Sequence, residues 1–147
     1  MTYPQTFVQD IIRQYCSPVQ INNTLDENKL IVEQFRHVWT PDLRILDATG
    51  FELYRWNGYL PPAEFAPRLL AGLAHARLRL RQFDAAQMLY ADVLRRFPTS
   101  FAAPEAAYFA ATAVYRKTGD GQKLVEGWDE LEKIYPMTEW TVKQGFP

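Results

Sequence analysis

Two short apolar runs separated by a tight turn constrain the fold of this chain more than any other feature. Leu43 to Asp47 and Phe51 to Trp56 flank Ala48-Thr49-Gly50, and a Thr40-Pro41 step leads into the first run. Two β-prone runs joined by a short glycine-containing turn are typical of a β-hairpin. We therefore expect an antiparallel strand pair in the first half of the chain.

Apolar periodicity predicts the elements that precede this hairpin. Apolar residues recur at three- and four-residue spacing from Thr6 to Tyr15, which indicates a short helix. Pro18 to Ile21 fits a short buried strand. Thr24 and Glu27 form a capping-box pattern, which predicts a second helix that continues through Phe35.

The segment from Trp39 to Leu53, with Arg55-Trp56-Asn57-Gly58 after it, resembles the second half of a thioredoxin domain. In that family the proline matched by Pro41 is cis and faces a Cys-x-x-Cys pair contributed from upstream. Here only 40 residues precede Pro41, and they contain a single cysteine, Cys16. The resemblance covers roughly residues 3 to 76 and implies a truncated thioredoxin-like scaffold without its redox centre.

The resemblance also implies that a central strand is missing. In the family this strand lies between those matched by Pro18 to Ile21 and Leu43 to Leu46, so its absence leaves two strand edges without partners. Three arrangements would satisfy them: direct pairing of the two strands, cover by a second copy of the chain, or a strand supplied by a separate chain. Because symmetric self-association is the commonest solution in soluble proteins, we expect a homodimer.

Helices dominate the rest of the chain. Pro61-Pro62 is suited to open a helix, because proline has no intrahelical donor to lose at the first position. Pro67 would break a bond further in, so we predict a kink or restart there and a regular helix from about Arg68 to Leu80. Met137-Thr138-Glu139-Trp140 predicts the capped start of a further helix near the end of the sequence.

Two similar units end at Pro98 and Pro136, 38 residues apart. This spacing resembles the tetratricopeptide repeat, a helix–turn–helix in which large residues pack against small ones and a proline closes the second helix. Gln82-Phe83-Asp84 and Thr118-Gly119-Asp120 occupy the expected inner turns. The matched positions are Ala86, Tyr90, Val93 and Phe97 with Leu124, Trp128, Leu131 and Tyr135, and Leu70, Leu73 and Ala74 with Tyr108, Ala111 and Thr112.

These patterns predict an α+β fold in which a partial thioredoxin-like sheet with helices is followed by two tetratricopeptide-like helical hairpins. We assign residues 1–66 to the truncated thioredoxin-like part and residues 67–147 to the helical hairpins. Two hairpins are fewer than the three repeats that are usually needed to bury a repeat core. We therefore expect the helix from Pro62 to Leu80 to be shared, so that the first part caps the second.

Composition and charge exclude several classes of function. The formal net charge is −1, so no overall field draws the chain to nucleic acid or to an anionic membrane. The longest nearly apolar stretch, Ala106 to Tyr115, is shorter than a membrane span, and the N-terminus has no signal-peptide pattern. We therefore expect a soluble, cytoplasmic protein. Five arginines gather locally and form either a solvated helix face or a surface for an acidic partner: Arg77, Arg79, Arg81, Arg95 and Arg96.

The sequence offers little for catalysis. Cys16 is the one available thiol, and it lies near the predicted end of a helix, where the helix dipole opposes a thiolate. His37 and His75 are far apart in sequence and belong to no zinc-binding pattern. A buried structural thiol is favoured over a Cys16–His37 dyad. We predict no catalytic residue, no metal site and no cofactor.

An aromatic and proline cluster is the best candidate for a binding site. The predicted partner-binding residues are Trp39, Thr40, Pro41, Trp56 and Tyr59, with Leu60 and Pro61 beside them. In the resembled family the loop before the cis-proline holds an extended peptide, and tryptophan and tyrosine suit an interface. The alternative is that both tryptophans simply seal the core. Trp140, Val142 and Phe146 face the same choice between packing and docking elsewhere.

The leading functional hypothesis is therefore a non-catalytic protein-interaction or assembly module on a redox-inactive scaffold. The alternative is a component of a thiol-disulfide redox protein, in which an upstream segment or a partner chain supplies the active-site half. A third hypothesis is a structural subunit that associates mainly with itself.

Overall fold

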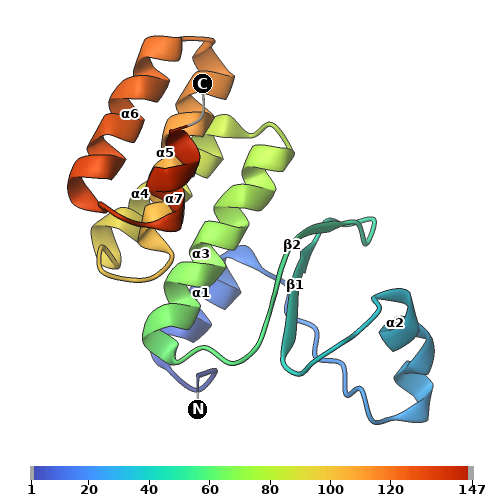
Figure 1. Cartoon of the computed structure of the whole chain (residues 1–147). Helices are drawn as coiled ribbons and strands as arrows, with labels where there is room; N and C mark the ends of the chain where they lie inside the picture. The colour runs from blue at the N-terminus through green and yellow to red at the C-terminus, as the bar shows by residue number, and fades with distance from the viewer. Residues whose placement is uncertain (1, 146–147) are drawn as a thin grey trace.

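The computed structural model describes residues 2–145 of the chain. Over this range the fold is α+β, as predicted, with a helical body, a small sheet on its flank and a projecting arm (Figure 1). The elements are α1 (Thr6–Tyr15), a 3₁₀ turn η1 (Asp26–Asn28), α2 (Lys29–Gln34), β1 (Asp42–Leu46), β2 (Glu52–Asn57), α3 (Pro62–Arg79), α4 (Phe83–Arg96), α5 (Ala103–Thr118), α6 (Gly121–Ile134) and α7 (Glu139–Gln144).

The predicted hairpin is confirmed. β1 and β2 pair antiparallel with Asp42 opposite Asn57 and Ile45 opposite Tyr54, and an irregularity follows Ile45. Because side chains alternate across a strand, Leu43, Ile45 and their partners share one face, and this face packs on the core beside α3. The sheet therefore has a covered face, while the outer edge of each strand carries no further strand in the described residues.

The segment before the hairpin agrees with the prediction only in its first helix. The helix α1 is confirmed, with Val8 and Ile11 fully or almost fully buried. The predicted strand from Pro18 to Ile21 is wrong: the segment is irregular, and Val19 is 81% exposed. A strand needs a neighbouring edge for its backbone groups, and among the described residues no backbone hydrogen bond joins 18–21 to β1. Direct pairing of these two segments therefore does not occur.

The predicted helix from Thr24 to Phe35 is also wrong in extent. It is replaced by the short η1 turn and the six-residue α2. The Asn22 side chain accepts hydrogen bonds from the backbone N–H and the hydroxyl of Thr24, at 3.0 and 2.8 Å. This local turn diverts the Thr24 hydroxyl from helix capping, which explains the late start of the helix.

The predicted restart at Arg68 is wrong, because α3 runs without interruption from Pro62 to Arg79 with Pro67 inside it. Pro67 lies near the beginning of the helix, where its missing N–H leaves the carbonyl of Ala63 without an intrahelical donor. Ala63 is exposed, so water can satisfy this carbonyl. The Pro67 ring is itself fully buried and contributes apolar packing.

The helices after the hairpin form two consecutive antiparallel pairs. Each of α3, α4, α5 and α6 packs on the next, and α7 lies against α5 and α6 (Figure 1). Asp120 caps α6 by accepting from the N–H of Gln122 at 3.0 Å, after Gly119 ends α5 at φ 74°. Thr138 and Thr141 form the predicted capped start of α7.

The core is centred on α3. Leu70 and Ala74 on this helix are completely buried, and Tyr90 and Val93 of α4 are buried beside them. The same helix contacts α1, both strands, α4 and α5. The hairpin and the helical pairs therefore share one hydrophobic core through α3.

Candidate functional site

Hydrogen bonds close the hairpin at both of its ends. Asp47 accepts hydrogen bonds from the Thr49 hydroxyl and from the N–H groups of Thr49 and Phe51, and these bonds lower the pKa of its carboxyl. At the other end, the N–H of Gly58 donates to the carbonyl of Pro41 at 2.9 Å. Gly58 has a φ of 94°, which favours glycine. This bond brings the entry and the exit of the hairpin together.

A small apolar groove opens where these ends meet the N-terminal segment. Its volume is about 310 Å³, at the lower end of the range for ligand pockets. The Thr2 hydroxyl donates to the carbonyl of Leu60 at 2.8 Å and holds the N-terminal segment against the hairpin exit. The lining residues are Thr2, Tyr3, Pro4, Pro41, Leu43, Gly58, Tyr59, Leu60 and Phe65.

Aromatic contacts define one wall of this groove. The ring of Tyr3 meets the ring of Phe65 edge to face, with centroids 5.4 Å apart. Burial raises the pKa of the Tyr3 hydroxyl, so this group is a neutral hydrogen-bonding group at physiological pH. The groove therefore offers apolar contact and hydroxyl groups but no charge of its own.

The structure divides the five predicted site residues between four environments. Pro41 and Tyr59 line the groove, and Tyr59 is 64% exposed. Trp56 packs into the core against Phe65, with ring centroids 5.7 Å apart, so the core interpretation holds for this tryptophan. Trp39 is 68% exposed, so the core interpretation is wrong for that one.

Thr40 belongs to a local hydrogen-bond cluster and does not line the groove. Its hydroxyl lies 3.1 Å from the Nε2 atom of His37 and accepts from the amide of Asn23 at the same distance. The Thr40–Pro41 peptide bond is cis, as the thioredoxin resemblance implies. The cluster links the residues just before Pro41 to Asn23, which lies earlier in the same projecting segment.

The thiol and the histidines do not assemble a reactive centre. Cys16 is half-buried after α1, and burial raises its pKa, which disfavours the thiolate. No hydrogen bond joins Cys16 to His37 among the described residues. In residues 2–145 no group of three or more His, Cys, Asp and Glu side chains could hold a metal ion.

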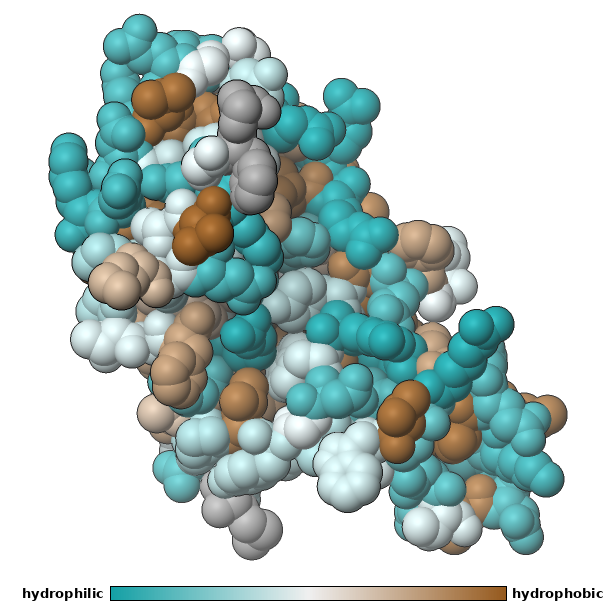
Figure 2. All heavy atoms as spheres, viewed as in Figure 1, coloured by the Kyte–Doolittle hydropathy of each residue, from teal (hydrophilic) through white to brown (hydrophobic). Residues whose placement is uncertain are grey.

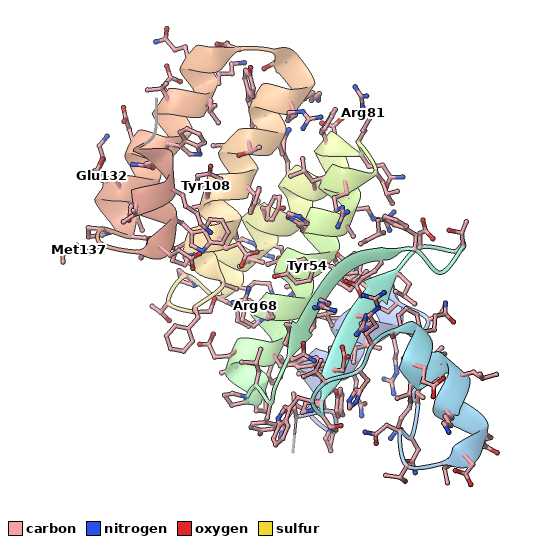
Figure 3. All side chains as sticks on the ribbon, turned by 45° about the vertical axis from the view of Figure 1, so that its right-hand side comes forward. Tyr54, Arg68, Arg81, Tyr108, Glu132 and Met137 are labelled. Atoms are coloured by element: carbon pink, nitrogen blue, oxygen red, sulfur yellow. The ribbon has the colours of Figure 1, made fainter. Side chains whose placement is uncertain are left out.

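A buried polar network lies outside every sequence-based prediction. The guanidinium of Arg68 on α3 donates to Glu105 on α5 at 2.6 Å and to the Tyr54 hydroxyl at 3.1 Å. The Tyr54 hydroxyl in turn donates to Glu105 at 3.2 Å. Figure 3 shows Tyr54 and Arg68 extending toward each other between β2 and α3. Glu105 is only 7% exposed, so the network links hairpin and helices inside the protein.

His75 lies next to this network without joining it. Its ring contacts those of Tyr54 and Phe109, with centroids 5.5 and 4.9 Å apart. Its Nδ1 atom is buried and has no hydrogen-bond partner. Burial lowers the pKa of His75, so the ring is neutral near pH 7.

The arginines identified in the sequence do not form one patch. Arg95 and Arg96 pair with Asp92 at one end of α4, while Arg77 donates to Gln82 at the other end. Fourteen helical residues separate these ends by about 20 Å. This arrangement favours the solvated-face interpretation over a single surface for an acidic partner.

Of the three residues near the end of the sequence, Trp140, Val142 and Phe146, the structure describes two, and these differ in their environment. Trp140 packs against Tyr108 and Phe109, with centroids 5.4 and 5.3 Å apart, so it belongs to the helical body. Val142 is exposed, and Phe146 lies outside the described residues. Among the described helices none is long and apolar enough to cross a membrane.

Comparison with known proteins adds no assignment: no family model matches the chain, and no curated protein or solved structure is significantly similar to it.

Proposed function

We propose that this chain is a non-catalytic protein-interaction or assembly module whose binding site is the apolar groove at Pro41 and Tyr59. The observation that carries the proposal is the groove itself, a cavity of about 310 Å³ with proline and aromatic walls. Such a site takes one or two bulky apolar side chains of an extended peptide, and exposed aromatic residues beside it extend the contact area. Trp39 and Tyr59 are exposed aromatic residues, and Tyr59 lines the groove together with Pro41.

The proposal includes the two resemblances and their consequences. A truncated thioredoxin-like part and tetratricopeptide-like hairpins would together form a scaffold for binding, located in the cytoplasm. A second copy of the chain is among the proposed partners, while nucleic acid and membrane are not. The raised pKa of the half-buried Cys16 thiol supports a non-enzymatic role.

Selection from a peptide library tests the groove. A phage-displayed library of random peptides is panned on immobilised protein, and enriched peptides are then titrated against the wild type and two variants. Tyr59→Ala should weaken peptide binding at least tenfold, because it removes a wall of the groove. Phe101→Ala removes an even more exposed aromatic side chain outside the groove and should leave binding unchanged.

Two results would contradict the proposal. Enriched peptides that bind Tyr59→Ala as well as the wild type would place the site elsewhere. Dithiol-dependent insulin reduction by the purified chain would instead support the alternative, a component of a thiol-disulfide redox protein.

A further inference from the structure

The segment from Ser17 to Pro41, which we call the arm, projects from the body of the protein (Figure 1). Its helix α2 packs on no element other than the adjoining η1 turn. The arm is held at its base, where the Arg44 guanidinium donates to the carbonyl of Phe35 at 2.7 Å and lies 5.0 Å from the centre of the Phe35 ring. At its end the arm is also held by hydrogen bonds from the Asn57 side chain to the Trp39 carbonyl and from the Gly58 N–H to the Pro41 carbonyl. Among the described residues, no hydrogen bond joins residues 17–34 to any residue outside the arm.

The arm is unusually apolar for an exposed segment. Figure 2 shows hydrophobic groups over α2 and its surroundings, interspersed with polar ones. Six large apolar side chains on the arm are 41–83% exposed: Val19, Ile21, Leu25, Leu30, Val38 and Trp39. An isolated helix shorter than about 12 residues is marginal in water, and α2 has six. Among the described residues, none covers these six side chains, and the short helix has no packing partner in the body.

We propose that the arm is a self-association element that packs against the arm of a second copy around a two-fold axis. The first argument is area. Six side chains exposed to this degree present several hundred Å², comparable with the roughly 800 Å² that each partner contributes to a standard interface. A two-fold interface joins the same patch on both subunits, so one apolar arm covers the other.

The second argument is the strand edge beside the arm. The arm leads through Pro41 directly into β1, and the outer edge of β1 pairs with no other strand in the described residues. An open edge offers unpaired backbone groups to another chain. Two copies of the same edge can pair antiparallel around a two-fold axis, so β1 and the arm form one continuous surface for a second copy.

The third argument is charge. The arm carries three acidic residues, Asp26, Glu27 and Glu33, and two basic ones, Lys29 and Arg36, which gives a net charge of −1. A surface with both signs and little net charge does not repel its own copy, and it has no field to attract a strongly charged partner. Charge therefore favours a second copy over an acidic or basic macromolecule.

This inference rests on the proposed assembly role but uses a different surface from the peptide groove. Pro41 is common to the arm and the groove lining, and Trp39 is the arm residue that we place beside the groove. The other five exposed apolar residues of the arm have no part in the proposed peptide site. Self-association and peptide binding can therefore be measured separately, and either can fail while the other stands.

The test is the solution mass of the full chain by light scattering and sedimentation velocity over a wide concentration range. We expect the wild type to have twice the mass of one chain at high concentration. Leu30→Glu combined with Val38→Glu should weaken the dimer at least tenfold, because both side chains are more than three-quarters exposed on the arm. Met88→Glu on α4 adds one such negative charge at an exposed site outside the arm and should leave the dimer intact.

A cross-linking measurement tests the contact directly. In a Cys16→Ser background, Val38→Cys should form a covalent dimer with a short bismaleimide, while Met88→Cys should not. A wild type that stays monomeric at every concentration would overturn the proposal, as would a dimer that the arm variant does not weaken. In either case the peptide titration with Tyr59→Ala still tests the groove independently.

Discussion

The two tryptophans nearest to Pro41 differ in environment although they look alike in sequence. Trp56 shares a sheet face with Leu43, its cross-strand partner, and packs on the core beside Phe65. Trp39 precedes the strand and is two-thirds exposed. Position relative to β1 therefore decides which tryptophan stabilises the fold and which remains free for contact with a partner.

This difference predicts opposite effects of the same substitution. Trp56→Ala should lower the free energy of unfolding by about 3 kcal/mol, because it removes the contacts of this partly buried ring with the core. Trp39→Ala should change it by less than about 0.5 kcal/mol, as expected for an exposed side chain. Urea unfolding followed by circular dichroism measures both values. Equal destabilisation by the two variants would contradict the assignment.

His75 predicts a pH dependence of stability. Burial lowers the pKa of this ring from the ordinary value of 6.5, and the nearby charge of Glu105 only partly opposes the shift. Below pH 6.5 the unfolded chain therefore takes up a proton that the folded protein resists. Stability should be unaffected by His75 above this pH and should fall as the pH drops below it, with a slope of at most about 1.4 kcal/mol per pH unit.

His75→Gln isolates this contribution, because glutamine does not titrate. The free energy of unfolding of both proteins is measured with urea from pH 7.5 to pH 5. The difference between the two values should change below pH 6.5, because the wild type loses more stability there than the variant. Parallel curves over the whole range would mean that His75 does not titrate differently in the two states.

At the scale of elements, two glycines mark where helices approach their neighbours closely. A Cβ atom added to Gly72 on α3 would lie 2.6 Å from the ring of Tyr54 on β2. One added to Gly127 on α6 would lie 2.5 Å from the Cβ atom of Ala111 on α5. The packing of the hairpin on α3 and of α6 on α5 therefore requires glycine at these two positions, because any side chain would clash with the neighbouring element.

Gly72→Ala should destabilise the protein by about 1–3 kcal/mol, because overpacking forces a shift in the neighbouring element. The Tyr54 ring cannot move away easily, since its hydroxyl is bonded to Arg68 and Glu105. Gly121→Ala is the control, because a Cβ atom there meets nothing within 4 Å. Thermal unfolding should show a loss for the first variant and none for the second. A neutral Gly72→Ala would show that the strand pair is free to shift.

Local sequence patterns were sufficient for elements that carry their own signals. The hairpin was predictable from its turn, α1 from its periodicity, and α7 from the Thr138 cap. The segment from Pro18 to Ile21 has strand-forming residues but no neighbouring edge, so a local pattern misled there. α3 continues through Pro67, whose ring is buried in the core, and the sequence alone does not indicate this packing.

The candidate sites were only partly predictable for the same reason. The aromatic and proline content of the hairpin segment indicates Pro41 and Tyr59. The groove also needs Tyr3, which lies far away in sequence and is held against the hairpin exit by the bond from Thr2 to Leu60. The Arg68–Glu105 pair joins residues 37 positions apart on different helices. Neither residue stands out from an ordinary charged helix surface, so no local signal could have indicated their contact.

At the scale of the whole molecule, α3 and the buried network make the hairpin and the helical pairs one cooperative unit. The predicted boundary at residue 66 falls inside α3, which packs on both strands and on α4 and α5. Glu105 extends this coupling, because it binds Tyr54 of β2 and Arg68 of α3 from a position on α5. A change at Glu105 should therefore reach the hairpin as strongly as the helices.

Glu105→Ala should lower the free energy of unfolding by about 3 kcal/mol, because it leaves the Arg68 guanidinium without its partner in a largely buried site. Native-state hydrogen exchange measures where this loss appears. In a cooperative unit, the slowest amides of β1, β2, α4 and α5 should lose the same amount of protection. Glu126→Ala on the exposed surface of α6 should change protection by less than about 0.5 kcal/mol. A loss confined to α5 and its helical neighbours would mean that the hairpin unfolds separately and that α3 does not couple the two parts.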